Sequence, residues 1–377
     1  MPCNTPPPPP ILEDLDDVIE DDPNELEYEF LPDELELVDD SALTFTSHTD
    51  SVLCCSFDKT GSLAVTGGQD EKAYVWYTGT GVVKFECPGH TESVISVHFN
   101  HDDSLVVTAD MDGVVQVFDV ASGTKVWNFD ATEITWTEWH PTANILFAGT
   151  IDGSCWKWSV PGDDICSLFQ TSGSGSSCGK LFDNGTKCAV GYMEGSIKVW
   201  DTENVQLIGS VTGKEAHESN VNCITCSSDG SLIATGSEDG TAKIIRSTNC
   251  RVLKTLQCSL SDEDKESIEG IGFLQGHTLL AVGTNDGNLR IFDVSTFVLR
   301  SLVSVSAPIV KLVCDEDQPL VYIASFGNIE RYDARTAQMD KKWTGHDNRI
   351  LDFVISGDKQ KALSVADDTL CKIYVIR

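Results

Sequence analysis

The sequence predicts an all-β protein, a β-propeller of eight four-stranded blades that follows an acidic N-terminal tail. Two observations predict the propeller: a pattern of short strands recurs through the chain, and its period is that of a single four-stranded blade. A third observation separates the tail, because the first residues differ sharply in composition from those that follow.

The recurring unit is an alternating strand, a turn, a strand of small residues, an acid followed by a small turn residue, and a third strand that usually ends in an aromatic residue. The third strands are expected to end near Trp76, Phe118, Trp158, Trp200, Ile245, Phe292, Tyr332 and Tyr374. Successive ends are 42, 40, 42, 45, 47, 40 and 42 residues apart, close to the roughly 40–45 residues of one blade. Eight ends therefore predict eight blades within residues 42–377.

The last repeat lacks an outermost strand of its own, because the chain stops at Arg377, directly after the third strand. Residues 42–47 read as a strand that stands just before a His, as other outermost strands do. We expect this N-terminal strand to complete the last blade and close the ring, which leaves no open sheet edge at the junction.

Residues 1–41 are expected to form a disordered tail. Between Met1 and Ser47 there are 15 Asp or Glu and no Lys or Arg, and the run from Pro6 to Pro10 favours an extended polyproline conformation. Such a segment buries too little apolar surface to offset its chain entropy. The tail should therefore be dispensable for folding.

The remainder of the chain is acidic as well, with 44 acidic against 26 basic residues from His48 onward. This balance argues against direct binding of nucleic acid or anionic membranes, since both need basic patches that displace counterions. It favours a protein partner with a basic segment.

No charged and apolar signal segment opens the chain, and no apolar run approaches the roughly 18 residues of a membrane span. We therefore expect a cytoplasmic protein without integral membrane association, in which the 14 Cys are free thiols. Cys223 and Cys226 have the spacing of a metal or redox motif, but they fall within one expected strand, where an odd spacing sends them to opposite faces. No metal or cofactor is expected.

In seven of the eight repeats an acid stands six residues before the end of the third strand, where a tight turn joins the second and third strands. Its carboxylate can accept backbone N–H groups that the turn leaves unpaired. These acids are Asp70, Asp112, Asp152, Glu194, Asp239, Asp286 and Asp368. A hydroxyl residue precedes four of them by four positions, and the same four repeats begin with a His.

The repeat resembles the WD-repeat family across residues 43–377. Trp200-Asp201 is the literal dipeptide, and Phe118-Asp119, Phe292-Asp293 and Tyr332-Asp333 are variants of it. The resemblance implies a rigid ring that binds partners through its loops. Repeats three, four, six and seven lack the His, and repeat seven has Phe326-Gly327 in place of the acid and glycine, which leaves the fate of that blade open.

The resemblance also implies a buried network in which the His bonds the turn acid and the strand hydroxyl, and a third-strand aromatic completes the set. Four repeats carry it: His48, Thr66, Asp70 and Trp76; His90, Thr108 and Asp112; His217, Thr235 and Asp239; and His346, Ser364 and Asp368. In repeat two the network should be weaker, because Phe118 cannot donate a hydrogen bond. The same residue types form hydrolase triads, but a catalytic set occurs once, whereas this one recurs at the blade period and so indicates a structural role.

Several stretches resemble one branch of the WD-repeat family, among them Phe85-Glu-Cys-Pro-Gly-His90 and Trp136-Thr-Glu-Trp-His-Pro141. This resemblance implies a non-enzymatic scaffold or chaperone, linked to cell migration and angiogenesis in animals or to large ribosomal subunit assembly through a basic ribosomal protein. An alternative is a substrate receptor of a cullin-type ubiquitin ligase, since Tyr332-Asp-Ala-Arg335 has an ending that such receptors carry. No nucleophile motif or phosphate loop supports an enzyme.

We expect the partner to bind the face where the loops before the first strands and the turns between the second and third strands emerge. Acids without an expected role in the network fall on this face: Asp50, Glu71, Glu92, Asp110, Glu133, Glu238, Asp347 and Asp367. The alternative is that these acids only keep the protein soluble. The protein is expected to act as a monomer.

Overall fold

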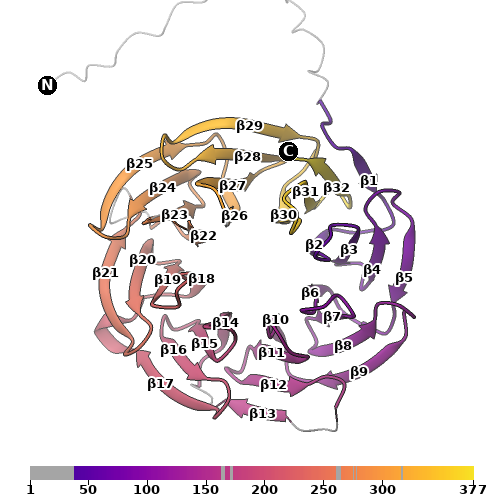
Figure 1. Ribbon diagram of the computed structural model, residues 1–377, viewed down its shortest axis with the longest axis horizontal. Coiled ribbons are helices and arrows are strands. Elements are labelled where there is room, and N and C mark those ends of the chain that lie inside the picture. Colours follow the sequence, from indigo (N-terminus) through magenta and orange to yellow (C-terminus); the bar gives the residue numbers. More distant parts are fainter. Residues whose placement is uncertain are drawn as a thin grey trace, which may run out of the picture. The chain divides into compact units, whose positions relative to one another are not determined.

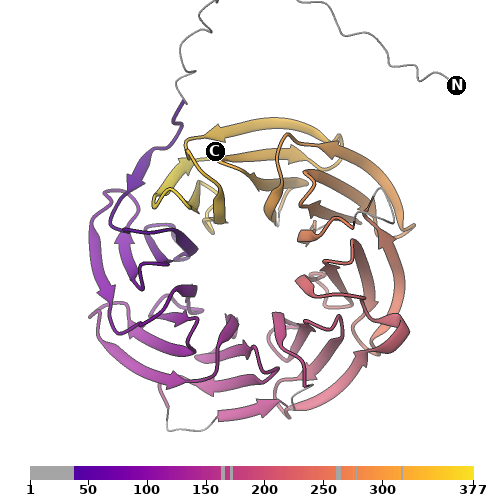
Figure 2. The same ribbon diagram turned by 180° about the vertical axis from the view of Figure 1, so that it is seen from behind.

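The computed structural model describes residues 38–162, 166–169, 173–259, 265–274, 276, 278–315 and 317–377. In this part of the chain eight four-stranded antiparallel sheets are arranged as a ring, seen from its two sides in Figure 1 and Figure 2. The prediction of an eight-bladed propeller is confirmed. The prediction of a disordered tail falls mainly on residues 1–37, which lie outside the described residues.

Each blade consists of four strands that follow one another in the chain and pair in that order, except at the ring junction. Blades one to four are formed by β2 (Val52–Phe57), β3 (Leu63–Gly68), β4 (Ala73–Tyr77), β5 (Val83–Cys87), β6 (Val94–Phe99), β7 (Leu105–Asp110), β8 (Val114–Asp119), β9 (Lys125–Asp130), β10 (Ile134–Trp139), β11 (Ile145–Thr150), β12 (Cys155–Ser159), β13 (Cys166–Phe169), β14 (Ser176–Phe182), β15 (Lys187–Tyr192), β16 (Ile197–Asp201) and β17 (Gln206–Val211). Blades five to eight are formed by β18 (Val221–Cys226), β19 (Leu232–Ser237), β20 (Thr241–Arg246), β21 (Arg251–Gln257), β22 (Ile268–Phe273), β23 (Leu279–Thr284), β24 (Asn288–Asp293), β25 (Val298–Ser304), β26 (Ile309–Cys314), β27 (Leu320–Ser325), β28 (Asn328–Asp333), β29 (Gln338–Thr344), β30 (Ile350–Ile355), β31 (Lys361–Ala366), β32 (Cys371–Val375) and the N-terminal β1 (Leu43–Phe45). A short 3-10 helix, η1 (Gly213–Glu215), lies in the loop before β18.

The first strand of each blade lies nearest the ring axis and the fourth lies at the rim (Figure 1). Blade seven, whose fate the sequence left open, is a complete sheet of β26 to β29. Its central turn is shortened to Phe326-Gly327, flanked by the paired residues Ser325 and Asn328. Phe326 adopts a positive φ of 49°, which closes this short turn without an acid.

The ring closes through β1, as the sequence predicted. β1 pairs antiparallel with β32, with Leu43 opposite Ile373 and Phe45 opposite Cys371. Phe45 is buried and its ring stacks on that of Trp76 in blade one, with the ring centroids 4.5 Å apart. The closing strand therefore forms backbone hydrogen bonds with blade eight, and its side chain Phe45 packs in the core between blades eight and one.

The predicted tail extends to residue 41, but residues 38–40 already contact blades seven and eight. The Asp39 carboxylate accepts a hydrogen bond from Lys372 Nζ at 2.5 Å, and the Asp40 amide donates to the Thr344 carbonyl at 2.9 Å. Asp40 also accepts the Thr344 amide at 3.0 Å. Composition alone could not assign these acids to the ring, since their partners lie more than three hundred residues away in the sequence.

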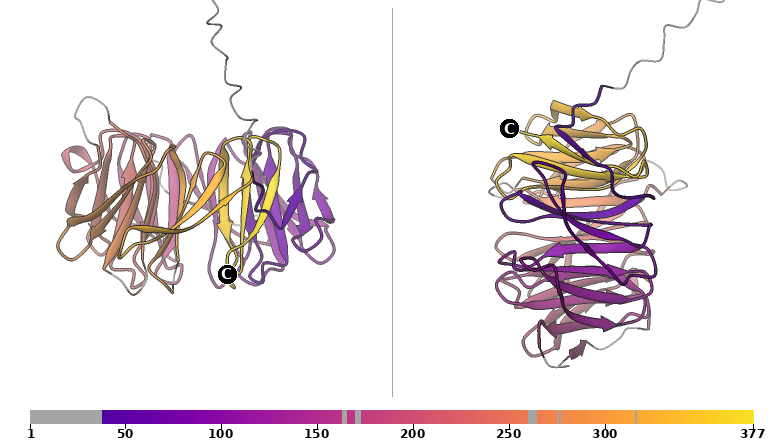
Figure 3. Two further views of the ribbon diagram at one scale, coloured as in Figure 1. Left: turned by 90° about the horizontal axis from the view of Figure 1, so that it is seen from above. Right: turned by 90° about the vertical axis from the view of Figure 1, so that its right-hand side faces the viewer.

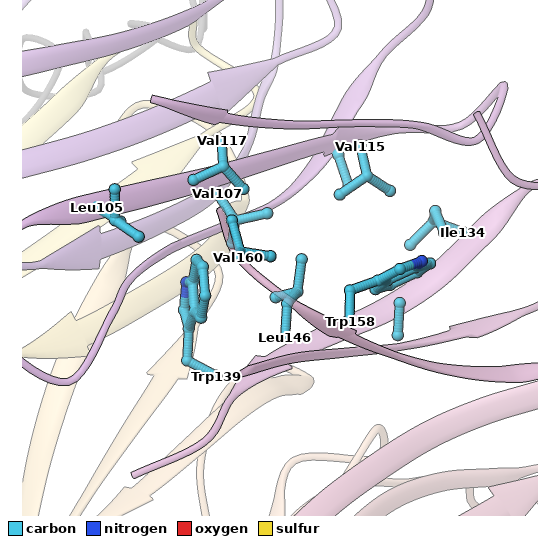
Figure 4. Close-up of a cluster of buried hydrophobic side chains, with 11 residues drawn as sticks. Leu105, Val107, Val115, Val117, Ile134, Trp139, Leu146, Trp158 and Val160 are labelled. Atoms are coloured by element: carbon cyan, nitrogen blue, oxygen red, sulfur yellow. The ribbon is translucent and has the colours of Figure 1, made fainter. Parts of the chain in front are cut away.

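The hydrophobic core lies between blades rather than within them. In the described residues, each of the eight junctions between neighbouring blades has its own cluster of buried apolar side chains. Figure 4 shows the junction of blades two and three, where Val107 and Val117 of one blade face Leu146 and Trp158 of the next. Each sheet thus buries both faces, and every blade depends on two neighbours.

The loop before each first strand, here called the leading loop, is tied to the turn between the second and third strands, here called the central turn. In blade one the ring of His48 bonds the Asp70 carboxylate through Nδ1 at 3.0 Å and the Thr66 hydroxyl through Nε2 at 2.9 Å. Trp76 Nε1 donates to the same hydroxyl at 3.3 Å. With the proton of the His48 ring on Nδ1, all three hydrogen bonds of this network can form. His48 Nδ1–H then donates to Asp70, and the Thr66 hydroxyl accepts from Trp76 and donates to His48 Nε2.

The carboxylate of this network stays ionised. Burial by itself would raise the pKa of Asp70, but the hydrogen bonds and charge of His48, with the amides of Thr49 and Lys72, outweigh it and lower that pKa. Asp239 and Asp368 show the same balance, and their pKa values are lowered too. Their networks join His217 to Thr235 at 2.8 Å and to Asp239 at 3.2 Å, and His346 to Ser364 at 2.7 Å and to Asp368 at 2.8 Å.

In blade two the predicted network acid was wrong. His90 Nδ1 bonds Asp110 at 2.8 Å, not Asp112, and His90 Nε2 bonds Thr108 at 2.8 Å. Asp110 is fully buried and accepts the Val114 amide at 2.9 Å, whereas Asp112 is exposed.

The reason is visible at the equivalent position of blade one, which holds Gly68. A Cβ on Gly68 would lie 2.9 Å from His48 Nδ1 and 2.8 Å from the Asp70 carboxylate. An Asp side chain at this position can therefore reach the space that the turn acid otherwise fills. In blade two Asp110 takes that space, and Asp112 is displaced to the surface.

In three blades without the His, the turn acid accepts a hydrogen bond from a hydroxyl residue only two positions away in the sequence. Thr150 donates to Asp152 at 2.6 Å in blade three, and Ser196 donates to Glu194 at 2.8 Å in blade four. In blade six the Thr284 hydroxyl donates to Asp286 and accepts Arg290 Nη1 at 2.9 Å, so a buried guanidinium contacts a hydroxyl at the position that Gly68 has in blade one. The acid is thus kept while its partner changes.

Deleting residues 1–47 should destabilise the ring far more than deleting residues 1–37. The longer deletion removes β1, exposes the edge of β32 and uncovers Trp76, and losing Phe45 alone is worth about 3–5 kcal/mol. Thermal melting of the two truncations and of Phe45→Ala measures this difference. If the two truncated proteins melt at the same temperature, β1 does not close the ring in solution.

Asp110→Asn should lower the free energy of unfolding by about 1–3 kcal/mol, because it weakens the acceptor of His90 and of the Val114 amide inside the fold. Asp112→Asn, a matched change two residues away on the surface, should alter it by less than about 0.5 kcal/mol. Urea unfolding of both variants decides the assignment. Equal losses, or a larger loss for Asp112→Asn, would contradict it.

Candidate functional site

The strands run between two faces of the ring, as the side views in Figure 3 show. The leading loops and the central turns all emerge on one face, because successive strands of a blade are antiparallel. We call this the acidic face, and the other the opposite face. The networks described above hold its loops and turns in place, so its surface residues are presented by a fixed backbone.

Seven of the eight acids predicted for the partner site lie on this face with surface access. Asp50, Glu92, Glu133 and Asp347 come from leading loops and Glu71 and Glu238 from central turns, all exposed, while Asp367, also in a central turn, is half-buried. Several of these carboxylates make local contacts only. Asp50 accepts the Ser51 amide at 2.8 Å, and Glu238 accepts the Ser219 hydroxyl at 2.8 Å.

Asp110 does not belong to this set, and its inclusion was wrong, because the buried carboxylate serves the His90 network. Asp112 is the surface acid of that turn instead. The sequence spacing could not predict which of the two acids is buried and which is exposed, since both residues are Asp and both flank Met111.

Sequence reasoning missed the apolar residues of the central turns. Met111, Ile151 and Met193 are 43%, 37% and 39% exposed, and Phe326 of blade seven is 52% exposed. The equivalent turn positions in blades one, five, six and eight are polar: Gln69, Glu238, Asn285 and Asp367. A large apolar residue beside a turn acid was the signal that could have identified them.

Near the ring axis, by contrast, opposite charges neutralise one another across blade junctions. Glu138 of β10 accepts Lys180 of β14 at 2.5 Å, and it also accepts the Leu181 amide at 2.6 Å. Lys311 of β26 forms an ion pair with Asp352 of β30, which also accepts the Cys55 amide of β2 at 3.0 Å. These charges link first strands of neighbouring blades.

The opposite face contains a cavity of 810 Å³ at the ends of the first strands of blades five, six and seven. Its walls include Cys226, Asp229, Phe273, Leu274 and Cys314. None of the predicted site residues lines it. Its mixed walls offer no charge complementarity to a basic segment comparable to that of the acidic face.

Within the described residues, the side chains do not assemble a metal-binding set. No group of three or more His, Cys, Asp or Glu side chains there could hold a metal ion. The four network His are buried, and burial raises the pKa of the Cys223 and Cys226 thiols, which disfavours thiolate. The helices of the described chain include none long and apolar enough to cross a membrane.

The Tyr332-Asp-Ala-Arg335 segment lies at the end of β28 on the opposite face. Arg335 is exposed, but its guanidinium is paired with the Asp333 carboxylate of the same turn, with Nη2 and Oδ2 2.6 Å apart. The ion pair is therefore local and lies on a different face from the predicted acids.

Two family models match the chain. The model for the WD domain, G-beta repeat, matches residues 40–77, 81–119 and 209–246, and that for the anaphase-promoting complex subunit 4 WD40 domain matches residues 232–316. These segments fall mainly in blades one, two, five, six and seven, and they include the closing strand β1 and the end of β17 in blade four.

Relatives and solved structures extend the likeness over the whole ring. The angio-associated migratory cell protein of Homo sapiens is 37% identical over 351 residues, which cover 90% of this chain and 81% of the relative. The ribosome assembly protein SQT1 of Saccharomyces cerevisiae is 25% identical over 402 residues, covering 97% of this chain and 91% of the relative.

Two crystal structures share the fold at 23% identity and a TM-score of 0.81, and each covers 90% of this chain and all of its own. One is Sqt1 of Saccharomyces cerevisiae, and the other is Sqt1 of Chaetomium thermophilum bound to the N-terminus of the ribosomal protein L10. The chain therefore belongs to the WD-repeat family that includes the angio-associated migratory cell protein.

Proposed function

We propose that this protein is a non-enzymatic, cytoplasmic chaperone or scaffold whose acidic face binds a basic segment of a protein partner. The candidate partner is a newly made ribosomal protein, and the N-terminus of the ribosomal protein L10 is the segment that the Sqt1 complex suggests. The protein would act as a monomer and would not touch nucleic acid directly.

One observation carries this proposal: the surface acids of the leading loops and central turns gather on one face, while charges near the axis are paired across blade junctions. Because the turn backbone is already held by the network, these surface carboxylates can contact a partner without weakening a blade. Their summed field would attract a basic segment and repel acidic competitors.

Charge by itself would give only moderate affinity. Exposed ion pairs contribute about 0.2–1 kcal/mol each, whereas micromolar binding corresponds to about 8 kcal/mol, so several pairs must act together and other contacts must add to them. A partner segment must therefore span several blades, which the circular arrangement of the acids on one face permits.

Reversing Glu92, Glu133 and Glu238 together to Lys should weaken binding of an L10 N-terminal peptide by about ten-fold or more, since attraction becomes repulsion at three positions. The dependence of the affinity on salt should also become shallower. Fluorescence anisotropy at a series of salt concentrations measures both effects, and thermal stability should be nearly unchanged.

The matched control reverses three exposed acids of the opposite face, Asp102, Glu203 and Asp317, to Lys, which changes the net charge by the same amount. This variant should bind the peptide within about two-fold of the parent at physiological salt, because charges beyond a Debye length of roughly 8 Å are screened. An equal loss of peptide affinity in both variants would mean that only the net charge of the protein matters, and it would refute the acidic face as the binding site. Failure of the parent to bind the peptide would remove L10 as the partner.

A further inference from the structure

The central turns of blades two, three and four expose an apolar side chain each, at the same position of the turn. These residues, Met111, Ile151 and Met193, form what we call the apolar arc, since they stand in consecutive blades on the acidic face. Each is followed directly by an acid: Asp112, Asp152 and Glu194. The arc is thus an apolar strip with a carboxylate beside every apolar residue.

The backbone holds the arc outward. In each turn the amide of the apolar residue donates to a carbonyl of the leading loop of its own blade: Met111 to Ser93 at 3.0 Å, Ile151 to Glu133 at 2.9 Å, and Met193 to Gly175 at 2.9 Å. The side chains therefore project from turns that are pinned beneath them. Their exposure is a property of a fixed surface.

The blades of the arc are joined across the junction of blades three and four. A Cβ on Gly175 would lie 2.6 Å from the Ile151 carbonyl oxygen and 2.8 Å from the Met193 sulfur. Gly175 thus lets the turn of blade three and the side chain of Met193 approach one another over the same leading loop. The result is a continuous surface across this junction.

The charges around the arc are mostly negative. The leading loops and central turns of blades two to four carry Glu92, Asp112, Glu133, Asp152 and Glu194, all exposed, and no Lys or Arg among their residues. The same face has Lys72 in blade one, Lys214 before blade five and Arg349 in blade eight. In blade four Lys198 lies beside the arc, with Nζ 5.2 Å from the centre of the Tyr192 ring, so positive charge is sparse near the arc.

We propose that the apolar arc is the docking strip for one amphipathic basic segment of a protein partner, whose apolar residues cover Met111, Ile151 and Met193 while its Lys or Arg meet the flanking acids. This proposal rests on the proposed function and adds to it the apolar half of the recognition. The two methionines suit such a role, because their flexible side chains adapt to partner residues of different shape.

A second copy of this chain does not fit the arc. A two-fold dimer through the arc would place the same patch against itself and bring five acids of each copy together with little counter-charge. An anionic lipid surface would be repelled for the same reason. The charge around the arc selects a basic protein segment.

The test uses the full chain and two synthetic helical peptides of equal length and equal positive charge, one with Leu on one face and one with Gln in place of every Leu. Calorimetry should find the Leu peptide bound about ten-fold more tightly than the Gln peptide by the parent protein. The variant Met111→Gln, Ile151→Gln, Met193→Gln should bind both peptides alike. Its salt dependence should match that of the parent, since every carboxylate remains.

The control variant removes three exposed apolar residues from the outermost strands, Leu207→Gln, Leu299→Gln and Met339→Gln. It should keep the preference of the parent for the Leu peptide. Circular dichroism should find all three proteins equally stable, because every substituted side chain is surface-exposed.

The proposal is overturned if the arc variant keeps the preference, if the control loses it equally, or if the parent protein binds both peptides alike. It is also overturned if sedimentation shows a dimer of the parent that the arc variant abolishes, since the occupant is then a second copy. If the parent binds the Gln peptide and reversing Glu92, Glu133 and Glu238 abolishes this binding, the acidic face is supported as the binding site even when the proposal for the arc is overturned. If neither peptide binds, the proposed function fails with it.

Discussion

The structure depends on one constraint: a four-stranded blade has two apolar faces and can bury neither by itself. Every cluster of buried side chains in the described chain lies between two blades, so each blade is stable only when both neighbours are present. A linear array would leave two exposed faces, and closing the ring removes them. The stacking of Phe45 on Trp76 matters for this reason, because it is made where the first and last blades meet.

Closure also explains why function gathers on one face. Once the strands are fixed between neighbours, only the loops and turns at their ends remain available for recognition. The His, Asp and Thr or Ser networks then hold the leading loops against the central turns in blades one, two, five and eight. The polar residues that most resemble a catalytic set are thereby used to build a rigid surface, and the neighbouring acids and apolar turn residues are left for a partner.

The blades differ in what they leave at that surface. In blade two the network takes its acid from the end of a strand, which frees the turn acid Asp112 and sets Met111 between a buried and an exposed carboxylate. Blades three and four replace the His network by a single hydroxyl contact to the turn acid and expose Ile151 and Met193. Blades two, three and four thus depart from the repeat pattern where the face is apolar, whereas blade six lacks the His but has the polar Asn285 at the same turn position.

The sequence by itself determined the fold, the number of blades and the closing strand, because strand alternation, turn residues and the blade period are local properties repeated eight times. It also placed seven of the eight surface acids, since their face follows from strand direction. Only the tertiary structure decided which of two nearby carboxylates meets His90, where the ring begins at Asp39 and Asp40, and that three apolar turn residues share one strip. Those facts depend on distances between side chains far apart in the chain, which no local pattern encodes.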